Sequence, residues 1–118
     1  MKSVDLIAAI ADHLDVPFPT LESRVRHWRS ASGLTLKRGR GAADLTREAA
    51  VDILAAICVA DRRLMSDHDL RTQARDRAER AYDHGAAFSV GPYGAFAETR
   101  TCPESVVRLA AECVAQSA

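Results

Sequence analysis

Apolar residues recur at helical spacing near the start of the chain. Ile7, Ile10 and Leu14 fall on one face, which predicts an amphipathic helix. Ser3 is suited to cap its N-terminus because a serine side chain can accept a hydrogen bond from the first free amides. The helix should end before the segment VPFPT at 16–20, whose two prolines cannot continue it.

A second, shorter helix is predicted over residues 20–32, with Thr20 as its N-cap. Leu21, Val25 and Trp28 form a single apolar stripe along it, and the rest of its surface is polar or basic. Trp28 continues the stripe, so we predict that its ring belongs to the core and does not stack on a ligand. The exposed side of such a helix is available for contact with a partner.

Residues 34–45, LTLKRGRGAADL, contain no helical stripe. The two glycines within this segment indicate a short two-stranded hairpin or an irregular loop. Thr46 then caps a long helix that extends to residue 65. This helix is apolar on more than one face, which predicts that it is central in the fold or shared with a partner chain.

The second half of the chain predicts two more helices and a hairpin. Ser66 and Asp69 have capping-box spacing and open a helix with a thin apolar stripe and a mixed-charge, solvated surface. Alternation from Phe88 predicts a β-hairpin with a loop of three or four residues. Thr101 and Glu104 form a second capping box, which opens the last helix.

This order of elements predicts a mainly α (α+β) fold. We expect a winged helix-turn-helix, followed by a helix, a β-hairpin and a C-terminal helix. Residues 1–65 are predicted to form a DNA-binding domain, and residues 66–118 a region for dimerisation or partner contact. The hairpin and helix at 86–116 have two open interpretations, because an exposed strand edge can pair with another chain or simply complete the core.

Composition excludes several classes of protein. The chain has 118 residues, about the length of one domain. It contains no apolar run approaching the roughly 18 residues of a membrane span, and its N-terminus does not resemble a signal peptide. Its odd cysteine count and spacing give no sign of a disulfide framework or a zinc site. We therefore expect a cytoplasmic protein with no membrane partner and no metal. The cysteines are Cys58, Cys102 and Cys113.

The formal net charge of zero conceals a basic segment. Six of the sixteen basic residues lie between Arg24 and Arg40, a stretch without an acid, which leaves ten basic and sixteen acidic residues elsewhere, a net charge of −6. A positive patch on an acidic body is typical of directed contact with phosphate. A simpler alternative remains open, because a basic run such as Lys37–Arg40 can be a solvated loop.

Double-stranded DNA is the partner that this arrangement favours. The major groove admits one α-helix, so a recognition helix must protrude from its support. Helix 20–32 would read bases, and the wing at 34–45 would hold the backbone or enter the minor groove. His27 could equally be an exposed histidine without a role. The predicted DNA-binding residues are Thr20, Ser23, Arg24, Arg26, His27, Arg29, Lys37, Arg38 and Arg40.

The segments IADHLDVPFPTLESRVRHWRSASGL, LKRGRG and LTREAAVDIL resemble the DNA-binding domain of the MerR-like winged-helix superfamily, which includes phage excisionases. The resemblance covers about residues 3–58. It implies duplex-DNA binding. The small, compact, alanine-rich chain is also similar in character to regulators encoded in bacterial prophages. We therefore expect a transcriptional regulator that forms a homodimer and contacts the transcription machinery or another regulator. The positions that match the family pattern are Thr20, Arg24, Trp28, Gly33, Leu34, Arg38 and Arg40.

The chain also departs from this family. Two prolines stand in its turn, the wing is short and lacks the usual aromatic residue, and no long coiled-coil helix follows. Effector sensing and metal regulation are therefore not carried over. No catalytic constellation or cofactor motif is found, so we do not expect an enzyme. The alternative function is a protein–protein adaptor or inhibitor that uses a degenerate winged helix, with residues 86–116 as its partner surface.

Overall fold

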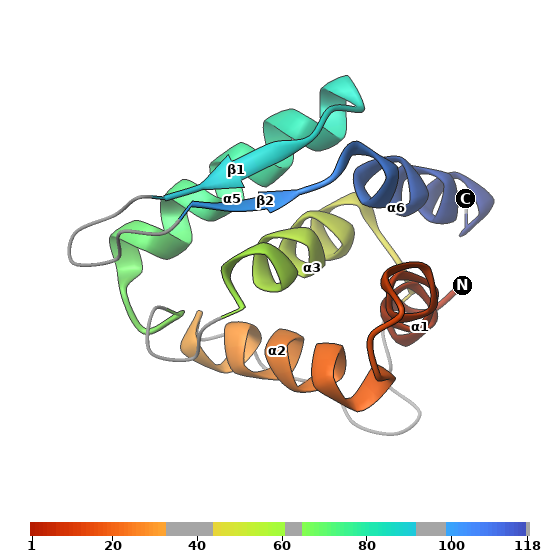
Figure 1. Cartoon of the computed structure of the whole chain (residues 1–118). Helices are drawn as coiled ribbons and strands as arrows, with labels where there is room; N and C mark the ends of the chain where they lie inside the picture. The colour runs from red at the N-terminus through yellow and green to blue at the C-terminus, as the bar shows by residue number, and fades with distance from the viewer. Residues whose placement is uncertain (33–43, 61–64, 92–98, 118) are drawn as a thin grey trace.

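The structure, a computed structural model, describes residues 1–32, 44–60, 65–91 and 99–117. Helices dominate, and the two strands form a small antiparallel sheet (Figure 1). The expected mainly helical class with a β-hairpin is confirmed. The expected wing lies almost entirely outside the described residues, so the winged helix stays a prediction. The elements are α1 (Ser3–Leu14), α2 (Phe18–Ala31), α3 (Arg47–Val59), α5 (His68–His84), β1 (Phe88–Val90), β2 (Arg100–Cys102) and α6 (Glu104–Ser117).

Helix α3 lies at the centre of the molecule (Figure 1). It contacts all the other labelled helices and both strands, and every residue from Ile53 to Val59 is buried. The prediction of a central helix is therefore confirmed. The predicted length is wrong, because α3 ends at Val59 and Ala60 adopts a left-handed backbone with φ of 59°.

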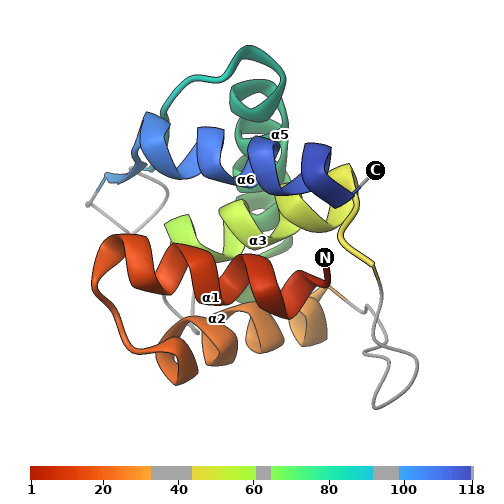
Figure 2. The same cartoon turned by 90° about the vertical axis from the view of Figure 1, so that its right-hand side faces the viewer.

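Helices α1 and α2 pack against each other on one side of α3, and α6 packs against α1 and α3. In Figure 2 these helices run across the view, while α5 stands upright behind them. Helix α1 ends at Leu14, where Asp15 takes a left-handed conformation with φ of 55°. The predicted end before the prolines is therefore confirmed.

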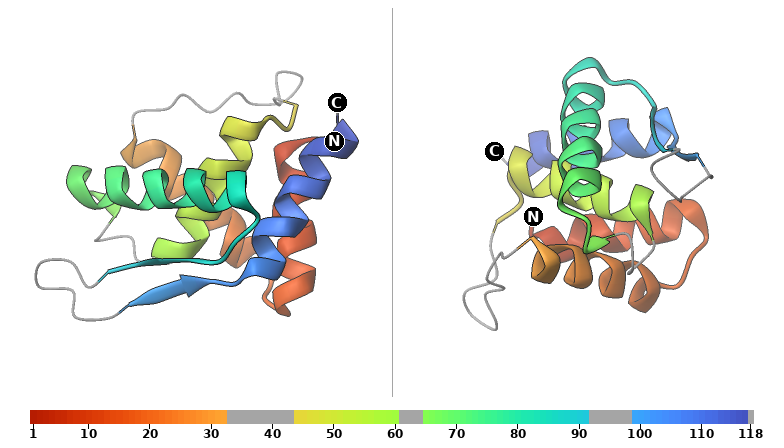
Figure 3. Two further views of the ribbon diagram at one scale, coloured as in Figure 1. Left: turned by 90° about the horizontal axis from the view of Figure 1, so that it is seen from above. Right: turned by 90° about the vertical axis from the view of Figure 1, so that its left-hand side faces the viewer.

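The hairpin lies alongside α5 and leads directly into α6 (Figure 3). Its register pairs Phe88 with Cys102 and Val90 with Arg100. The described pairing stops at Val90 and resumes at Arg100, and most of the predicted loop lies outside the described residues. The inner face of β1 is apolar, because Phe88 and Val90 are both buried.

Helix starts differ from the predicted caps in four places. Helix α1 begins at Ser3 itself, and Lys2, not Ser3, is at its N-cap. Helix α2 begins at Phe18 after Pro17, so Thr20 is in its first turn; prolines suit that turn because its amides lack helical partners. Asp67, and not Ser66, caps α5, since its carboxylate accepts from the Leu70 amide at 3.1 Å. Thr101 lies in β2, and α6 begins only at Glu104.

One continuous apolar core includes residues on both sides of the predicted domain boundary at residue 65. Trp28, predicted as a core residue, is 1 % exposed. Cys58 is also buried, as its apolar surroundings predict. No helix in the described ranges is long and apolar enough to cross a membrane.

Candidate functional site

Helix α2 separates an anchored side from an exposed side. Leu21, Val25 and Trp28 are buried, and α2 packs on α1 and α3. Thr20 and Ser23, on the opposite side, are exposed. A helix held in this way presents a fixed polar surface, which is what contact with a groove requires.

Arg26 belongs to the exposed side, but its charge is partly compensated. Its guanidinium donates to the Glu22 carboxylate at 2.8 Å, and the Arg26 side chain is 62 % exposed. An exposed pair of this kind contributes little to stability. Arg26 can therefore exchange its carboxylate partner for a phosphate at small cost.

The other predicted residues of α2 are less accessible than expected. His27 and Arg29 are half-buried. Arg24 is also half-buried and lines a cavity beneath the helix, so the expectation that it reaches outward differs from the structure. Arg24 lies three residues after Leu21 and four before Trp28, so it adjoins the buried stripe. This spacing is the sequence signal from which the inward position of Arg24 could have been predicted.

The predicted wing residues Lys37, Arg38 and Arg40 lie outside the described part of the chain. The residues on either side of this segment are described. Helix α2 reaches its C-cap at Ser32, and Asp44 forms an antiparallel bridge with Lys2.

The segment after the wing is attached to the N-terminus. The Lys2 ammonium bonds to the Asp44 carboxylate at 2.7 Å and holds the pKa of that carboxyl below its ordinary value. The Leu45 amide donates to the Met1 carbonyl at 2.9 Å, and the Leu45 side chain is buried. These contacts fix where the chain re-enters the fold before α3.

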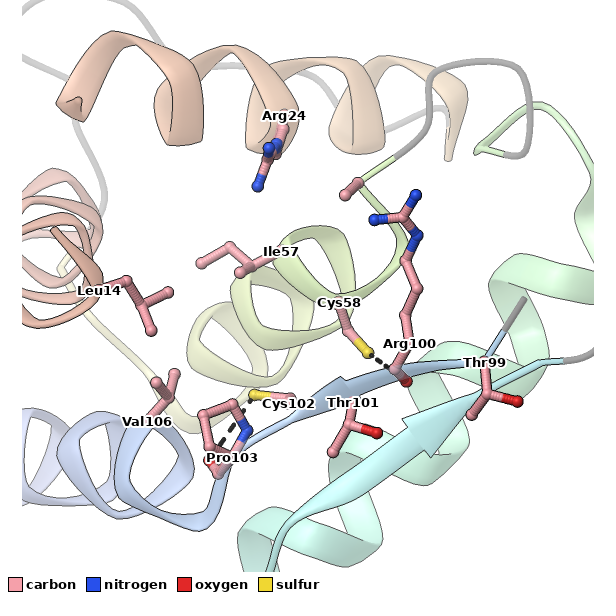
Figure 4. A pocket seen from close by; sticks show the side chains of 11 residues that line it. Leu14, Arg24, Ile57, Cys58, Thr99, Arg100, Thr101, Cys102, Pro103 and Val106 are labelled. Carbon is pink, nitrogen blue, oxygen red and sulfur yellow. Dashed lines mark hydrogen bonds between the residues drawn. The ribbon is translucent and has the colours of Figure 1, made fainter. Parts of the chain in front are cut away.

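A cavity of about 410 Å³ lies between α2, α3 and β2 (Figure 4). Arg24 extends into it from α2, and Arg100 extends into it from β2. The alternating pattern suggests that Arg100 faces outward, but its cross-strand partner is the buried Val90. Arg100 therefore shares the inner face of the hairpin.

Two thiols stand in the wall of this cavity. Cys58 donates to the Arg100 carbonyl at 3.4 Å, and burial raises the pKa of Cys58 to about 11. Burial likewise raises the pKa of Cys102 to about 12. Both thiols are neutral at physiological pH and are poor nucleophiles. Among the described residues, no group of three or more histidines, cysteines or acids is arranged to hold a metal.

Sequence reasoning did not include Arg100 in the candidate site. Arg24 and Arg100 line one cavity because the hairpin packs on α3, and no local motif indicates that packing. Comparison with known protein families, curated proteins and solved structures found no significant match.

Proposed function

We propose that the protein is a sequence-specific regulator that binds double-stranded DNA. In this proposal α2 enters the major groove, and the segment 34–45 contacts the adjoining backbone or minor groove. The observation that carries it is the acid-free basic stretch from Arg24 to Arg40, which begins on a helix with an exposed polar side. Positive charge concentrated in this way favours phosphate over a generic solvated surface.

Base contact is assigned to the exposed side of α2. Thr20 and Ser23 are exposed, and hydroxyl groups can donate to or accept from base edges. The anchoring of Trp28 in the core supports this role, because a rigid support keeps the helix in one orientation. His27 is at the flank of the same surface and is the next candidate for a base contact.

Phosphate contact is assigned mainly to Lys37, Arg38 and Arg40, and Arg26 of α2 is the fourth candidate. Arg24 is left out, because it lines the cavity beneath the helix. Four phosphate contacts predict that the logarithm of the binding constant falls with the logarithm of salt at a slope of roughly −3 to −4.

A homodimer is part of the proposal, with residues 66–118 as the region for pairing or for contact with the transcription machinery. Two copies related by a twofold axis would bind half-sites about 34 Å apart or at multiples of that distance. Light scattering at the concentrations used for binding measures the oligomeric state directly. A dimer should also select a palindromic DNA site.

The test is a pulldown of random duplex DNA with the intact chain, followed by sequencing. A variant with Lys37→Ala, Arg38→Ala and Arg40→Ala should lose most of the recovered DNA. Arg80→Ala is the matched control, since Arg80 is an exposed arginine on α5, with a side chain 75 % exposed. Equal loss in both variants would indicate general charge attraction and contradict the proposed interface.

The adaptor alternative gives a different result. If the protein acts by contacting another protein, the triple variant should capture its partner as well as the wild type does. The footprint should then fall within residues 86–116, the predicted partner surface, and enrichment of duplex sequence should be absent.

A further inference from the structure

The cavity between α2, α3 and β2 is built by elements that are distant in sequence. Leu14 closes it from α1, Ile57 from α3 and Val106 from α6. These three side chains make part of its lining apolar (Figure 4). Its volume of about 410 Å³ falls within the range of about 300 to 1,000 Å³ that is typical of small-molecule sites.

Positive charge enters this cavity from two walls. The side chains of Arg24 and Arg100 both reach into the cavity. The described lining residues include no carboxylate. The thiols of Cys58 and Cys102 add no negative charge, because burial keeps them protonated.

Arg24 has no carboxylate partner in the described ranges, unlike several arginines of the fold. Arg26, Arg47 and Arg75 each pair with a carboxylate. Arg24 has no such partner within the described ranges, although it is half-buried. A guanidinium directed into a partly apolar cavity favours an anion there, because it carries several donors in a planar arrangement that matches a carboxylate.

We propose that this cavity binds a small organic carboxylate, with Arg24 and Arg100 contacting the carboxylate group and Leu14, Ile57 and Val106 contacting its apolar body. An inorganic anion would make no apolar contact with Leu14, Ile57 and Val106. A neutral molecule would provide no charge to pair with the guanidinium of Arg24. The site lies beneath α2 and does not depend on DNA binding.

A competing structural role for the arginines is testable by the same measurement. The carboxyl end of α3 also borders the cavity through Cys58 and Ala60, and that end of a helix attracts cations. If Arg24 and Arg100 only stabilise the carboxyl end of α3 by their charge, the cavity should show no preference for a carboxylate ligand.

The experiment is an NMR titration of the intact ¹⁵N-labelled chain with sodium hexanoate at constant ionic strength. Hexanamide is the matched neutral probe, and sodium phosphate is the anion without an apolar body. We expect hexanoate to shift amides around the cavity with a dissociation constant on the order of 1 to 10 mM. Hexanamide and phosphate should each bind at least roughly tenfold more weakly.

Three arginine variants complete the test. Arg24→Gln should weaken hexanoate binding by roughly tenfold or more, with dispersed amide signals showing that the chain is folded. Arg29→Gln is the control, because Arg29 is a half-buried arginine of the same helix that does not line the cavity. Arg100→Gln, on the opposite wall of the cavity, should weaken hexanoate binding in the same way.

Three results would overturn the proposal. They are the absence of shifts at the cavity, equal binding of hexanamide or phosphate, and equal weakening by Arg29→Gln and Arg24→Gln. No DNA is present in the titration, so its failure is separate from a failure of the proposed DNA interface.

Discussion

Arg24 on α2 and Arg100 on β2 direct their side chains into one cavity, although they are distant in sequence (Figure 4). Their shared position at the cavity depends on two features of packing. Arg24 adjoins the buried stripe of α2, and Arg100 is paired with the buried Val90 across the hairpin. On α2, Arg24 therefore points into the cavity, Arg26 is exposed and Arg29 is half-buried.

Arg24 and Arg75 should differ in how much each contributes to the stability of the fold. Arg24→Met should change the free energy of unfolding by less than about 1 kcal/mol, because no described carboxylate loses a partner. Arg75→Met should lower it by about 1 to 2 kcal/mol, because it removes a 2.8 Å bond to Asp52, whose side chain is only 16 % exposed, and leaves that acceptor unpaired. Urea unfolding measures both, and a larger loss for Arg24→Met would contradict this account.

The start of α3 should depend on one hydroxyl group. The Thr46 hydroxyl accepts from the Ala49 amide at 3.1 Å, so Thr46→Ala should cost about 1 kcal/mol of unfolding free energy. The control is Thr72→Ala, within α5, where alanine is the better helix former and the cost should be near zero. Thermal and urea unfolding of the two variants, compared side by side, provide the check.

Stability should fall at alkaline pH through the buried thiols. The folded chain raises the pKa of Cys58 to about 11 and that of Cys102 to about 12, whereas an unfolded thiol has a pKa near 8.5. The neutral thiols therefore stabilise the fold fully below about pH 8.5, and this contribution declines as pH rises towards 11 to 12. Between pH 8 and pH 10, the free energy of unfolding, measured in urea, should decline less steeply for Cys102→Ala than for the wild type. Identical slopes in the two proteins would argue against buried neutral thiols.

Sequence preference and affinity should be separable. Ser23→Ala removes an exposed hydroxyl from α2 without removing charge. It should reduce discrimination between a selected site and a single-base variant of it by between about fivefold and a hundredfold. The salt dependence should not change, because no phosphate contact is lost. Competition binding with the two duplexes at two salt concentrations distinguishes this outcome from a general loss of affinity.

The sequence predicted the parts of the fold that depend on apolar periodicity. Burial repeats along a helix, so the stripe of α2, the core position of Trp28 and the central place of α3 could all be inferred from local spacing. The N-cap at Thr46 was also predictable, because its hydroxyl acts on an amide three residues away.

Other features depend on competition between nearby residues or on distant contacts. Pro17, and not Thr20, precedes α2, because prolines are tolerated in a first turn. Thr101 is drawn into β2, where its hydroxyl bonds to that of Ser89 at 2.9 Å. The inward position of Arg100 follows from strand pairing, which a single strand pattern does not specify.

The central claim is that the segment around Lys37, Arg38 and Arg40 binds duplex DNA together with α2. Its most direct test is the salt dependence of binding to a selected duplex, measured by fluorescence anisotropy for the wild type and for the triple alanine variant. We predict a slope of roughly −3 to −4 for the wild type and near −1 for the variant. Absent binding, or a slope that is the same in both proteins, would contradict the claim.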